Sequence, residues 1–233
     1  MPDSATHADE ERASTAVETV RPLADERVDV SVSQTSMVFE GYIWAVRQDT
    51  FNYNGSSIVR EYIDHPGAVA VLALDEQDRV LLIKQYRHPT GLRGWELPAG
   101  LLDIAGENAL VGAQRELAEE ADVVATEWAL LTEFYTTPGG SNEAIRIYLA
   151  RGVSAIAAFD RTHEEADIEP RWVSLDACVD AVLARRVSNP ILMVGILAAQ
   201  VARSRGWSAL APADSPWPRH PQSSDSRSLH ITS

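Results

Sequence analysis

Three glutamates, Glu116, Glu119 and Glu120, stand within the run ELAEE and form the densest group of chemically useful side chains in the sequence. In a helix, Glu116 would be three and four residues from the other two, and side chains at these spacings share one face. Like charges at such spacings repel each other by roughly 0.2–0.5 kcal/mol per pair, so we expect a cation to hold them together. Hard cations such as Mg²⁺ bind carboxylate oxygens together with waters and substrate phosphates. The spacing therefore predicts a site for Mg²⁺ or Mn²⁺.

Arg115 offers a second interpretation of this run. Arg115 and Glu119 are spaced i, i+4, so Arg115 could hold Glu119 as a structural partner. Glu116 and Glu120 would then remain as oxygen ligands. A solvated acidic helix face with ordinary Glu–Arg pairing is the other alternative, and for an isolated ELAEE run it is the commoner one.

Three neighbouring features favour a metal site over a solvated face. A loop rich in proline and glycine, WELPAGLLDIAGE, precedes the helix and brings the backbone of Ala99 and Gly100 near its start. Arg115 lies directly before the first glutamate, and a second acidic pair, Glu164 and Glu165, follows downstream. Together they make the metal site the favoured interpretation.

Composition and charge limit the class of protein. The chain has 233 residues, of which 45% are apolar, and a formal net charge of -14. That charge argues against nucleic-acid binding, which needs clustered Lys and Arg, but divalent cations can still bring a small phosphate compound to carboxylates. The single cysteine, Cys178, lies in an apolar helical pattern and is interpreted as a buried structural thiol. Because we find no signal-peptide pattern, and the longest apolar segment, residues 191–202, is too short to span a bilayer, we expect a cytoplasmic protein without membrane contact.

The sequence divides into four parts. Residues 1–30 form an acidic tail and residues 207–233 a tail dense in Pro, Ser, Asp and Arg, and both compositions predict disorder. Residues 31–64 predict a small antiparallel β unit, in which VFEGYIWAV is a strand and Asn54-Gly55 is the hairpin turn to a partner strand. So few strands are not stable alone, so the unit must pack on the following domain or on another subunit.

Residues 65–206 predict the main domain, an α/β fold with a mixed sheet between helices. Its expected strands are GAVAVLAL and RVLLIKQYR, joined by a polar turn at residues 75–78, and then residues 129–135, AIRIYLA and RWVSL. Its expected helices cover residues 106–121 and 176–186, and a last helix begins at Pro190 with Ser188 or Asn189 as its cap.

The acidic helix and its preceding loop resemble the signature box of the Nudix hydrolase family. The box is a glycine, five residues, a glutamate, seven residues, and then Arg-Glu-apolar-x-Glu-Glu-x-Gly-apolar. The matching residues are Gly100, Glu107, Arg115, Glu116, Leu117, Glu119, Glu120 and Val123. Two positions depart from it: six residues separate Gly100 from Glu107, and Asp122 replaces the late glycine. Asp122 falls where the helix ends, a position that favours left-handed backbone and accepts Asp at modest cost.

This resemblance implies a Nudix-like α/β/α sandwich in which a loop–helix–loop metal site hydrolyses a diphosphate joined to a nucleoside and a second group. It implies Glu116 and Glu120 as metal ligands, with Glu119 and the backbone carbonyl of Ala99 as additions. It also places Arg115 and Glu119 in the catalytic set.

A catalytic base is expected from the second acidic pair, in the segment RTHEEADIEP. Members of the family often take their base, or a further metal ligand, from the corresponding loop, so Glu164 and Glu165 are the candidates and Glu165 is preferred. A mobile acidic loop tip is the alternative explanation of this pair.

The motif TTPGGSNE, residues 136–143, bears on the substrate. A proline sixteen residues after Asp122, here Pro138, resembles the ADP-ribose pyrophosphatase subfamily, although a plain Pro-Gly-Gly turn is the commoner case. The stretches REYIDHPGAV and WELPAG and the N-terminal β unit resemble the same subfamily. The resemblance implies that ADP-ribose is hydrolysed to AMP and ribose 5-phosphate. It also implies that the β unit is exchanged across a homodimer and helps to form the adenosine pocket.

Several further residues are candidates for substrate binding. Arg87 ends the strand VLLIKQYR and is the expected diphosphate-binding cation, since its planar fork can hold two oxygens. Arg60 could reach across a dimer or form an edge-strand salt bridge. Trp44 and Trp95 could stack on adenine, although strand aromatics usually belong to the core. The remaining candidates, for ribose hydroxyls, outer metal waters or loop contacts, are Glu96, Glu143, Pro138, Gly139 and Ser141.

Two alternatives for the function stay open. The enzyme could act on another nucleoside-diphosphate sugar or on a dinucleotide, since pockets select by shape and hydrogen bonds that the sequence does not reveal. The domain could instead bind a nucleotide as a sensor without cleaving it. Such copies normally lose a ligand carboxylate, and Glu116, Glu119 and Glu120 are all present.

Overall fold

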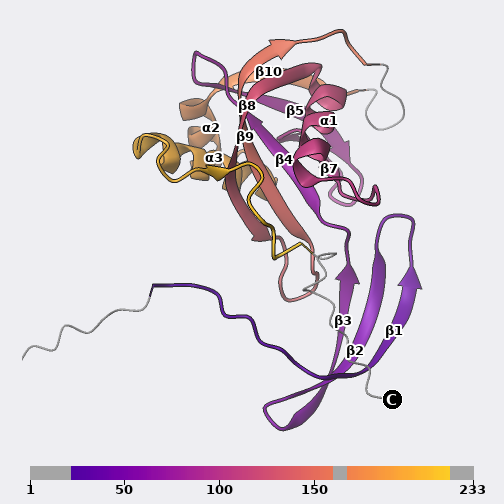
Figure 1. Cartoon of the computed structure of the whole chain (residues 1–233). Helices are drawn as coiled ribbons and strands as arrows, with labels where there is room; N and C mark the ends of the chain where they lie inside the picture. Colours follow the sequence, from indigo (N-terminus) through magenta and orange to yellow (C-terminus); the bar gives the residue numbers. More distant parts are fainter. Residues whose placement is uncertain (1–21, 160–166, 221–233) are drawn as a thin grey trace, which may run out of the picture. The chain divides into compact units, whose positions relative to one another are not determined.

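The computed structural model describes residues 22–159 and 167–220, and its elements follow one another as drawn in Figure 1. The strands are β1 Val32–Glu40, β2 Ala45–Tyr53, β3 Ser56–Asp64, β4 Ala68–Ala73, β5 Arg79–Arg87, β6 Leu92–Glu96, β7 Ala99–Leu101, β8 Val123–Tyr135, β9 Ala144–Ala155, β10 Glu169–Ser174 and β11 Ala211–Pro212. The helices are α1 Ala109–Ala121, α2 Leu175–Leu183 and α3 Pro190–Ser204. Within these described residues, none of the helices is long and apolar enough to cross a membrane.

Strands β1, β2 and β3 form an antiparallel sheet in that order. Asn54 and Gly55 have φ angles of 51° and 76°, so the expected hairpin turn between β2 and β3 is confirmed. The prediction of one strand through VFEGYIWAV is wrong, because the chain reverses inside it, where the N–H of Gly41 donates to the carbonyl of Trp44. A Cβ at Gly41 would lie 2.7 Å from that carbonyl oxygen, so glycine makes the reversal possible.

Two further sheets build the main domain. Five strands pair in the order β11-β8-β9-β4-β7, with β4 and β9 parallel and the other pairs antiparallel. Three strands pair antiparallel in the order β10-β5-β6. The expected α/β fold with a mixed sheet is therefore confirmed.

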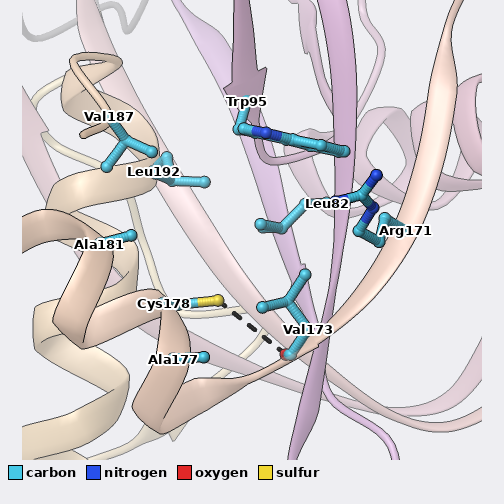
Figure 2. A pocket seen from close by; sticks show the side chains of 9 residues that line it. All are labelled: Leu82, Trp95, Arg171, Val173, Ala177, Cys178, Ala181, Val187 and Leu192. Atoms are coloured by element: carbon cyan, nitrogen blue, oxygen red, sulfur yellow. Dashed lines mark hydrogen bonds between the residues drawn. The ribbon is translucent and has the colours of Figure 1, made fainter.

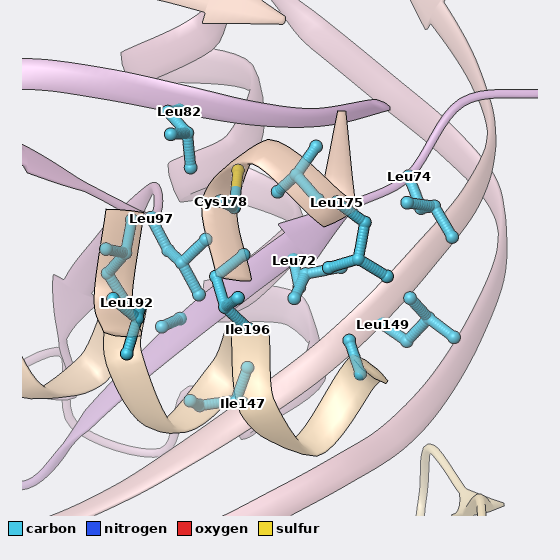
Figure 3. Close-up of a cluster of buried hydrophobic side chains, with 14 of the residues drawn as sticks. Leu72, Leu74, Leu82, Leu97, Ile147, Leu149, Leu175, Cys178, Leu192 and Ile196 are labelled. Atoms are coloured by element: carbon cyan, nitrogen blue, oxygen red, sulfur yellow. The ribbon is translucent and has the colours of Figure 1, made fainter. Parts of the chain in front are cut away.

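Buried side chains on the two faces of β4 separate the core into two clusters. Ala68, Ala70 and Leu72 pack with residues of α2 and α3, and this cluster is drawn in Figure 3. Val69, Val71 and Ala73 pack with the buried face of α1. Because side chains alternate across a strand, one short apolar strand serves both layers, which explains its unbroken hydrophobic sequence.

The strands β4 and β5 are consecutive in sequence but belong to different sheets. Between them Asp75 makes a tight turn, in which its backbone N–H donates to the carbonyl of Arg79, and Asp78 has a φ of 56°. The expected polar turn is present, and the sequence did not reveal that the chain changes sheet there.

Helix α1 begins at Ala109, three residues later than expected, because the side chain of Asn108 caps it by accepting a hydrogen bond from the N–H of Leu110. The helix ends at Ala121, and its C-cap, Asp122, has the left-handed φ of 55° expected for this position. The side chain of Asp122 also accepts a hydrogen bond from the N–H of Phe159 at 2.8 Å. The last helix, α3, has Asn189 as its cap and Pro190 in its first turn, which decides between the two expected caps.

Residues 207–220 differ from the disordered tail that their composition predicted. Trp207 and Leu210 pack against the α2–α3 cluster, and β11 pairs with β8. The buried Arg146 donates to the carbonyls of Ser215 and Pro216, and its guanidinium lies 4.7 Å from the ring centroid of Trp217. A few large aromatic anchors thus offset the polar composition of the segment.

Candidate active site on helix α1

A buried glutamate holds helix α1 against β7. Glu120 is 5% exposed, and its Oε2 accepts a hydrogen bond from the N–H of Ala99 at 2.7 Å. A buried carboxylate without a partner would be costly, so this contact fixes the position of the side chain. The structure thereby brings together two of the expected ligand residues, which lie on different elements.

Gly100 is the second point of approach between β7 and α1. A Cβ built at Gly100 would lie 1.9 Å from Cδ and Oε1 of Glu116, and 2.5 Å from its Cγ. Carbon atoms in contact are normally about 3.5–4.0 Å apart, so a side chain at position 100 does not fit while Glu116 keeps its place. Glycine lets the carboxylate of Glu116 reach the backbone of β7.

Arg115 binds three carboxylates at once. Its Nε and Nη2 donate to the two oxygens of Glu107 at 3.0 and 3.1 Å, and its Nη1 donates to Glu116 at 2.7 Å and to Glu119 at 3.0 Å. The hydrogen bonds that the guanidinium donates to Glu107, followed by the charge of Glu116, raise the pKa of Arg115 against the opposing effect of burial. The expected Arg115–Glu119 pair is present, and the contacts to Glu107 and Glu116 were not foreseen from spacing.

The carboxylate oxygens of α1 are engaged within the protein. Among the residues that the structure describes, no three His, Cys, Asp or Glu side chains are grouped around one point that could hold a metal ion. The contacts explain this, because Arg115 binds Glu116 and Glu119 while the backbone of Ala99 binds Glu120. The donor set nevertheless fits a hard divalent cation, since it consists of carboxylate oxygens in a space that a Cβ at position 100 would fill. A cation here would compete with Arg115 for its carboxylates.

Arg87 and Glu96, both expected to bind substrate, form an ion pair with each other. The Nη2 of Arg87 lies 2.7 Å from Oε2 of Glu96, and its Nε donates to the same carboxylate. Glu96 is 4% exposed and accepts a further hydrogen bond from the buried Gln85 at 3.2 Å. The Arg87 side chain is 48% exposed, so this pair holds a guanidinium at the surface in a fixed direction.

The loop between β8 and β9 carries four expected substrate residues, Pro138, Gly139, Ser141 and Glu143. Glu143 closes the base of the loop, because its Oε2 accepts a hydrogen bond from the hydroxyl of Thr136 at 2.5 Å. Its Oε1 lies 3.5 Å from Nε2 of His65, whose pKa burial lowers, although Glu143 acts to raise it. A Cβ built at Gly139 meets nothing within 4 Å, so packing does not hold the tip of the loop at that point.

The other expected site residues lie away from α1 or outside the described residues. Arg60 is on β3 and donates to the carbonyl of its neighbour Val59 at 2.7 Å. Trp44 is 41% exposed and stands just before β2. Glu164 and Glu165, the candidates for the base, lie in residues 160–166, outside the described part of the chain.

The NUDIX domain family matches residues 64–191, more than half of the chain, and this match includes α1 and all the carboxylates that Arg115 binds. This chain belongs to the Nudix hydrolase family. It is 38% identical over 190 residues to a protein of Mycobacterium tuberculosis (strain ATCC 25618 / H37Rv) named ADP-ribose pyrophosphatase, an alignment that covers 81% of this chain and 91% of that protein. It is 36% identical over 134 residues, 58% of this chain and 72% of the relative, to a protein of the same name from Bacillus subtilis (strain 168).

The Nudix fold is also supported by a solved structure. The chain superposes on a crystal structure titled ADP compounds hydrolase with a TM-score of 0.64, covering 78% of this chain and 99% of that one. The two sequences are 17% identical, so the likeness concerns the fold.

An apolar cavity of about 150 Å³ lies in the Nudix domain between strands β5, β6 and β10 and helices α2 and α3 (Figure 2). Trp95 lines it, with Lys84 Nζ at 5.3 Å and Arg171 Cζ at 4.7 Å from its ring. No residue of α1 lines this cavity. Cys178 also lines it, and burial raises the pKa of that thiol to about 11, in agreement with the expected structural role.

Sequence reasoning gave no role to Asn142 and did not identify the contacts of His65. The side chain of Asn142 binds the end of β3 with two hydrogen bonds, and Nε2 of His65 lies near Glu143. Asn142 stands within the motif TTPGGSNE, so its place beside Glu143 was visible, but its partners seventy-seven and seventy-eight positions away were not.

Proposed function

We propose that this Nudix hydrolase converts ADP-ribose and water to AMP and ribose 5-phosphate with the help of Mg²⁺ or Mn²⁺. The observation that carries the proposal is the set of three glutamates that Arg115 and Ala99 hold between α1 and β7. The names of the Mycobacterium tuberculosis and Bacillus subtilis relatives support ADP-ribose as the substrate. Divalent metal ions are generally used in this family.

In this proposal, Glu116 and Glu120 bind the metal ion. Glu119 and the backbone carbonyl of Ala99 are its additional ligands. A bound divalent ion neutralises charge on the diphosphate and lowers the pKa of a water molecule. Arg115 keeps Glu116 and Glu119 on one face of α1, because one guanidinium nitrogen binds both. This lowers the repulsion between the carboxylates before substrate binds.

The remaining residues bind and orient the substrate. Arg87 presents a half-exposed guanidinium whose direction Glu96 fixes, which suits two oxygens of a diphosphate. Glu165, or in its place Glu164, accepts a proton from the attacking water. The water oxygen bonds to one phosphorus while the bond from that phosphorus to the bridging oxygen breaks, so each product leaves with one phosphate.

We also propose that a second copy of the chain covers the β1–β3 sheet and completes the adenosine pocket. Large apolar side chains are exposed on this sheet and its turn, namely Met37, Val38, Phe39, Tyr42, Ile43 and Trp44. Exposed apolar groups of this size favour a protein interface. Phe39→Asp should give a monomer by size-exclusion chromatography with light scattering, whereas Leu183→Asp, which changes an exposed leucine of α2, should not. A monomeric native protein would refute the dimer.

The activity is tested with the purified full-length chain, ADP-ribose and Mg²⁺, with AMP measured by chromatography. Replacing Glu120 by Gln should lower kcat by about a hundredfold or more, the size of loss typical of a group that acts on the reacting charge. Glu127→Gln, which changes an exposed glutamate of β8, is the matched control. Absence of AMP from a folded protein that binds Mg²⁺ would refute the substrate, and a panel of other nucleoside-diphosphate sugars and dinucleotides would then identify it. Unchanged turnover in Glu120→Gln would refute the metal role.

A further inference from the structure

The end of β3 and the loop of residues 136–143 are joined by backbone hydrogen bonds. The N–H of Ile63 donates to the carbonyl of Gly140 at 2.9 Å, and the N–H of Asn142 donates to the carbonyl of Ile63 at 3.2 Å. Ile63 and Ser141 form a parallel bridge, and the Ser141 hydroxyl donates to Ile63 at 3.3 Å. The loop is therefore attached to the N-terminal sheet over a short stretch of chain.

Asn142 reinforces this attachment with both ends of its carboxamide. Its Oδ1 accepts a hydrogen bond from the N–H of His65 at 2.8 Å, and its Nδ2 donates to Oδ1 of Asp64 at 2.8 Å. Only a side chain with one acceptor and one donor can satisfy both partners, and Asn has this pair at the required reach. Asp64 is in turn bound by Arg47 of β2 at 2.5 Å.

His65 extends the network to the far end of the loop. Its Nδ1 accepts a hydrogen bond from the N–H of Gly67 at 3.1 Å, which assigns the ring proton to Nε2. That nitrogen lies 3.5 Å from Glu143, and Glu143 accepts a hydrogen bond from Thr136. Polar contacts thus run from the N-terminal sheet to the two residues at the base of the loop.

The tip of the loop is a turn, in which the N–H groups of Gly140 and Ser141 both donate to the carbonyl of Thr137 at 2.9 Å. These bonds shape the turn but do not join it to the N-terminal sheet. Gly139 and Gly140 are adjacent, and a Cβ built at either would meet nothing within 4 Å. Glycine loses more conformational freedom on ordering than any other residue, so a Gly-Gly tip takes a defined position only when its neighbours fix it. The contacts of residues 140–142 with Ile63, Asp64 and His65 supply that constraint.

We propose that Asn142 is a positioning residue, which holds the loop of Pro138 and Gly139 at a fixed place relative to the N-terminal sheet. This inference rests on the proposed function and on the expectation from the sequence that Pro138, Gly139 and Ser141 of the loop bind the substrate. Asn142 itself stays bound to β3 and makes no contact with the substrate. Its removal lets the loop move, which weakens substrate binding and leaves the metal-bearing helix α1 unchanged.

The kinetic test uses Asn142→Ala in the full-length chain with ADP-ribose and Mg²⁺. We expect KM to rise about tenfold and kcat to stay within twofold, because a lost positioning contact affects binding before the chemical step. Gln77→Ala, which removes an exposed carboxamide in the turn between β4 and β5, is the control and should keep both constants. An unchanged KM, or a fall in kcat alone, would overturn the proposal.

A reciprocal exchange separates positioning from general damage. Asn142→Asp leaves two carboxylates facing each other and should raise KM at least as much as the alanine variant does. Adding Asp64→Asn restores one donor and one acceptor across the same contact, so the double variant should return KM to within about threefold of the native value. Failure of this rescue, with the double variant folded, would count against the assigned hydrogen bonds.

Hydrogen exchange provides a readout that does not depend on activity. In Asn142→Ala, the amides of residues 136–143 should exchange about tenfold faster than in the native protein, while those of α1 should not change. Unchanged loop exchange would refute the positioning role. If the native chain does not hydrolyse ADP-ribose, the proposed function fails, and the exchange result still decides whether Asn142 fixes the loop.

Discussion

Replacing Gly100 by Ala should disable the active site while leaving the fold intact. The new Cβ would lie 1.9 Å from the carboxyl carbon of Glu116, whereas carbon contacts need about 3.5–4.0 Å, so the carboxylate must move by roughly 1.5–2 Å. Misplacing a reacting group by about 1 Å can cost about a hundredfold in rate, so we expect kcat/KM to fall at least a hundredfold. The assay is steady-state release of AMP from ADP-ribose at saturating Mg²⁺.

The stability cost of Gly100→Ala should be small by comparison. The clash is with the end of a flexible side chain and not with backbone, so Glu116 can turn away at the cost of its 2.7 Å ion pair with Arg115. We expect the free energy of unfolding, measured in urea, to fall by about 1 kcal/mol, the lower end of the overpacking range.

Gly94→Ala is the matched control for this change. Gly94 lies in β6, has no positive φ, and a Cβ built there meets nothing within 4 Å. Its activity should stay within twofold of the native value. If Gly100→Ala kept more than a third of native kcat/KM, the position of Glu116 against β7 would not matter for catalysis, and the metal-site reasoning would fail.

Three further predictions concern Arg115, Arg146 and Cys178. Arg115→Lys loses the two-point contact with Glu107, so kcat/KM should fall about tenfold or more while the secondary structure measured by circular dichroism stays native. Arg146→Ala removes the buried partner of Glu133, which keeps its ion pair with Arg219, and it frees residues 211–220. The free energy of unfolding should fall by about 1.5–3 kcal/mol, with faster proteolysis of that segment, and an unchanged midpoint in urea would contradict this. Burial raises the pKa of the Cys178 thiol from 9.0 to about 11, so its contribution to stability is complete below pH 9 and is lost as the pH rises towards 11. Cys178→Ala should lack this decline in stability between pH 9 and 11, and the native thiol should resist alkylation at pH 8.

The sequence predicted the local features of the fold well, because short-range chemistry decides them. The hairpin at Asn54, the left-handed backbone of Asp122 and the cap at Asn189 each depend on one residue and its immediate neighbours. The prediction of a single strand through VFEGYIWAV failed because apolar residues continue on both sides of the reversal at Gly41, and only the close approach to the carbonyl of Trp44 marks it.

Long-range pairing accounts for what the sequence did not reveal. The change of sheet between β4 and β5 depends on which other strands β4 and β5 pair with. Both segments have the same apolar pattern, so the sequence alone does not distinguish their sheets. Residues 207–220 looked too polar to fold, yet Arg146 of β9 supplies the guanidinium that binds their carbonyls. Composition cannot show a partner that lies about seventy positions away.

The same distinction applies to the active site. The spacing of Glu116, Glu119 and Glu120 identified the acidic face, since all three lie within little more than one turn of helix. It did not reveal that Arg115 binds Glu107 as well, because those two residues meet only once the preceding loop has folded back on α1. The position of Arg87 at the end of its strand predicted an available guanidinium, but the sequence did not reveal that Glu96 of β6 is its ion-pair partner.

Asp122 changes what the late glycine of the family box means. Its φ of 55° supplies the backbone shape that the helix end needs, and its carboxylate binds the N–H of Phe159, which a glycine could not do. The position therefore requires left-handed backbone and not glycine itself, and Asp adopts that backbone at modest cost. Its side chain also adds a hydrogen bond to a distant part of the same chain. A search that insists on glycine here would pass over chains that still have every carboxylate, whereas one that accepts Gly, Asn or Asp would retain them.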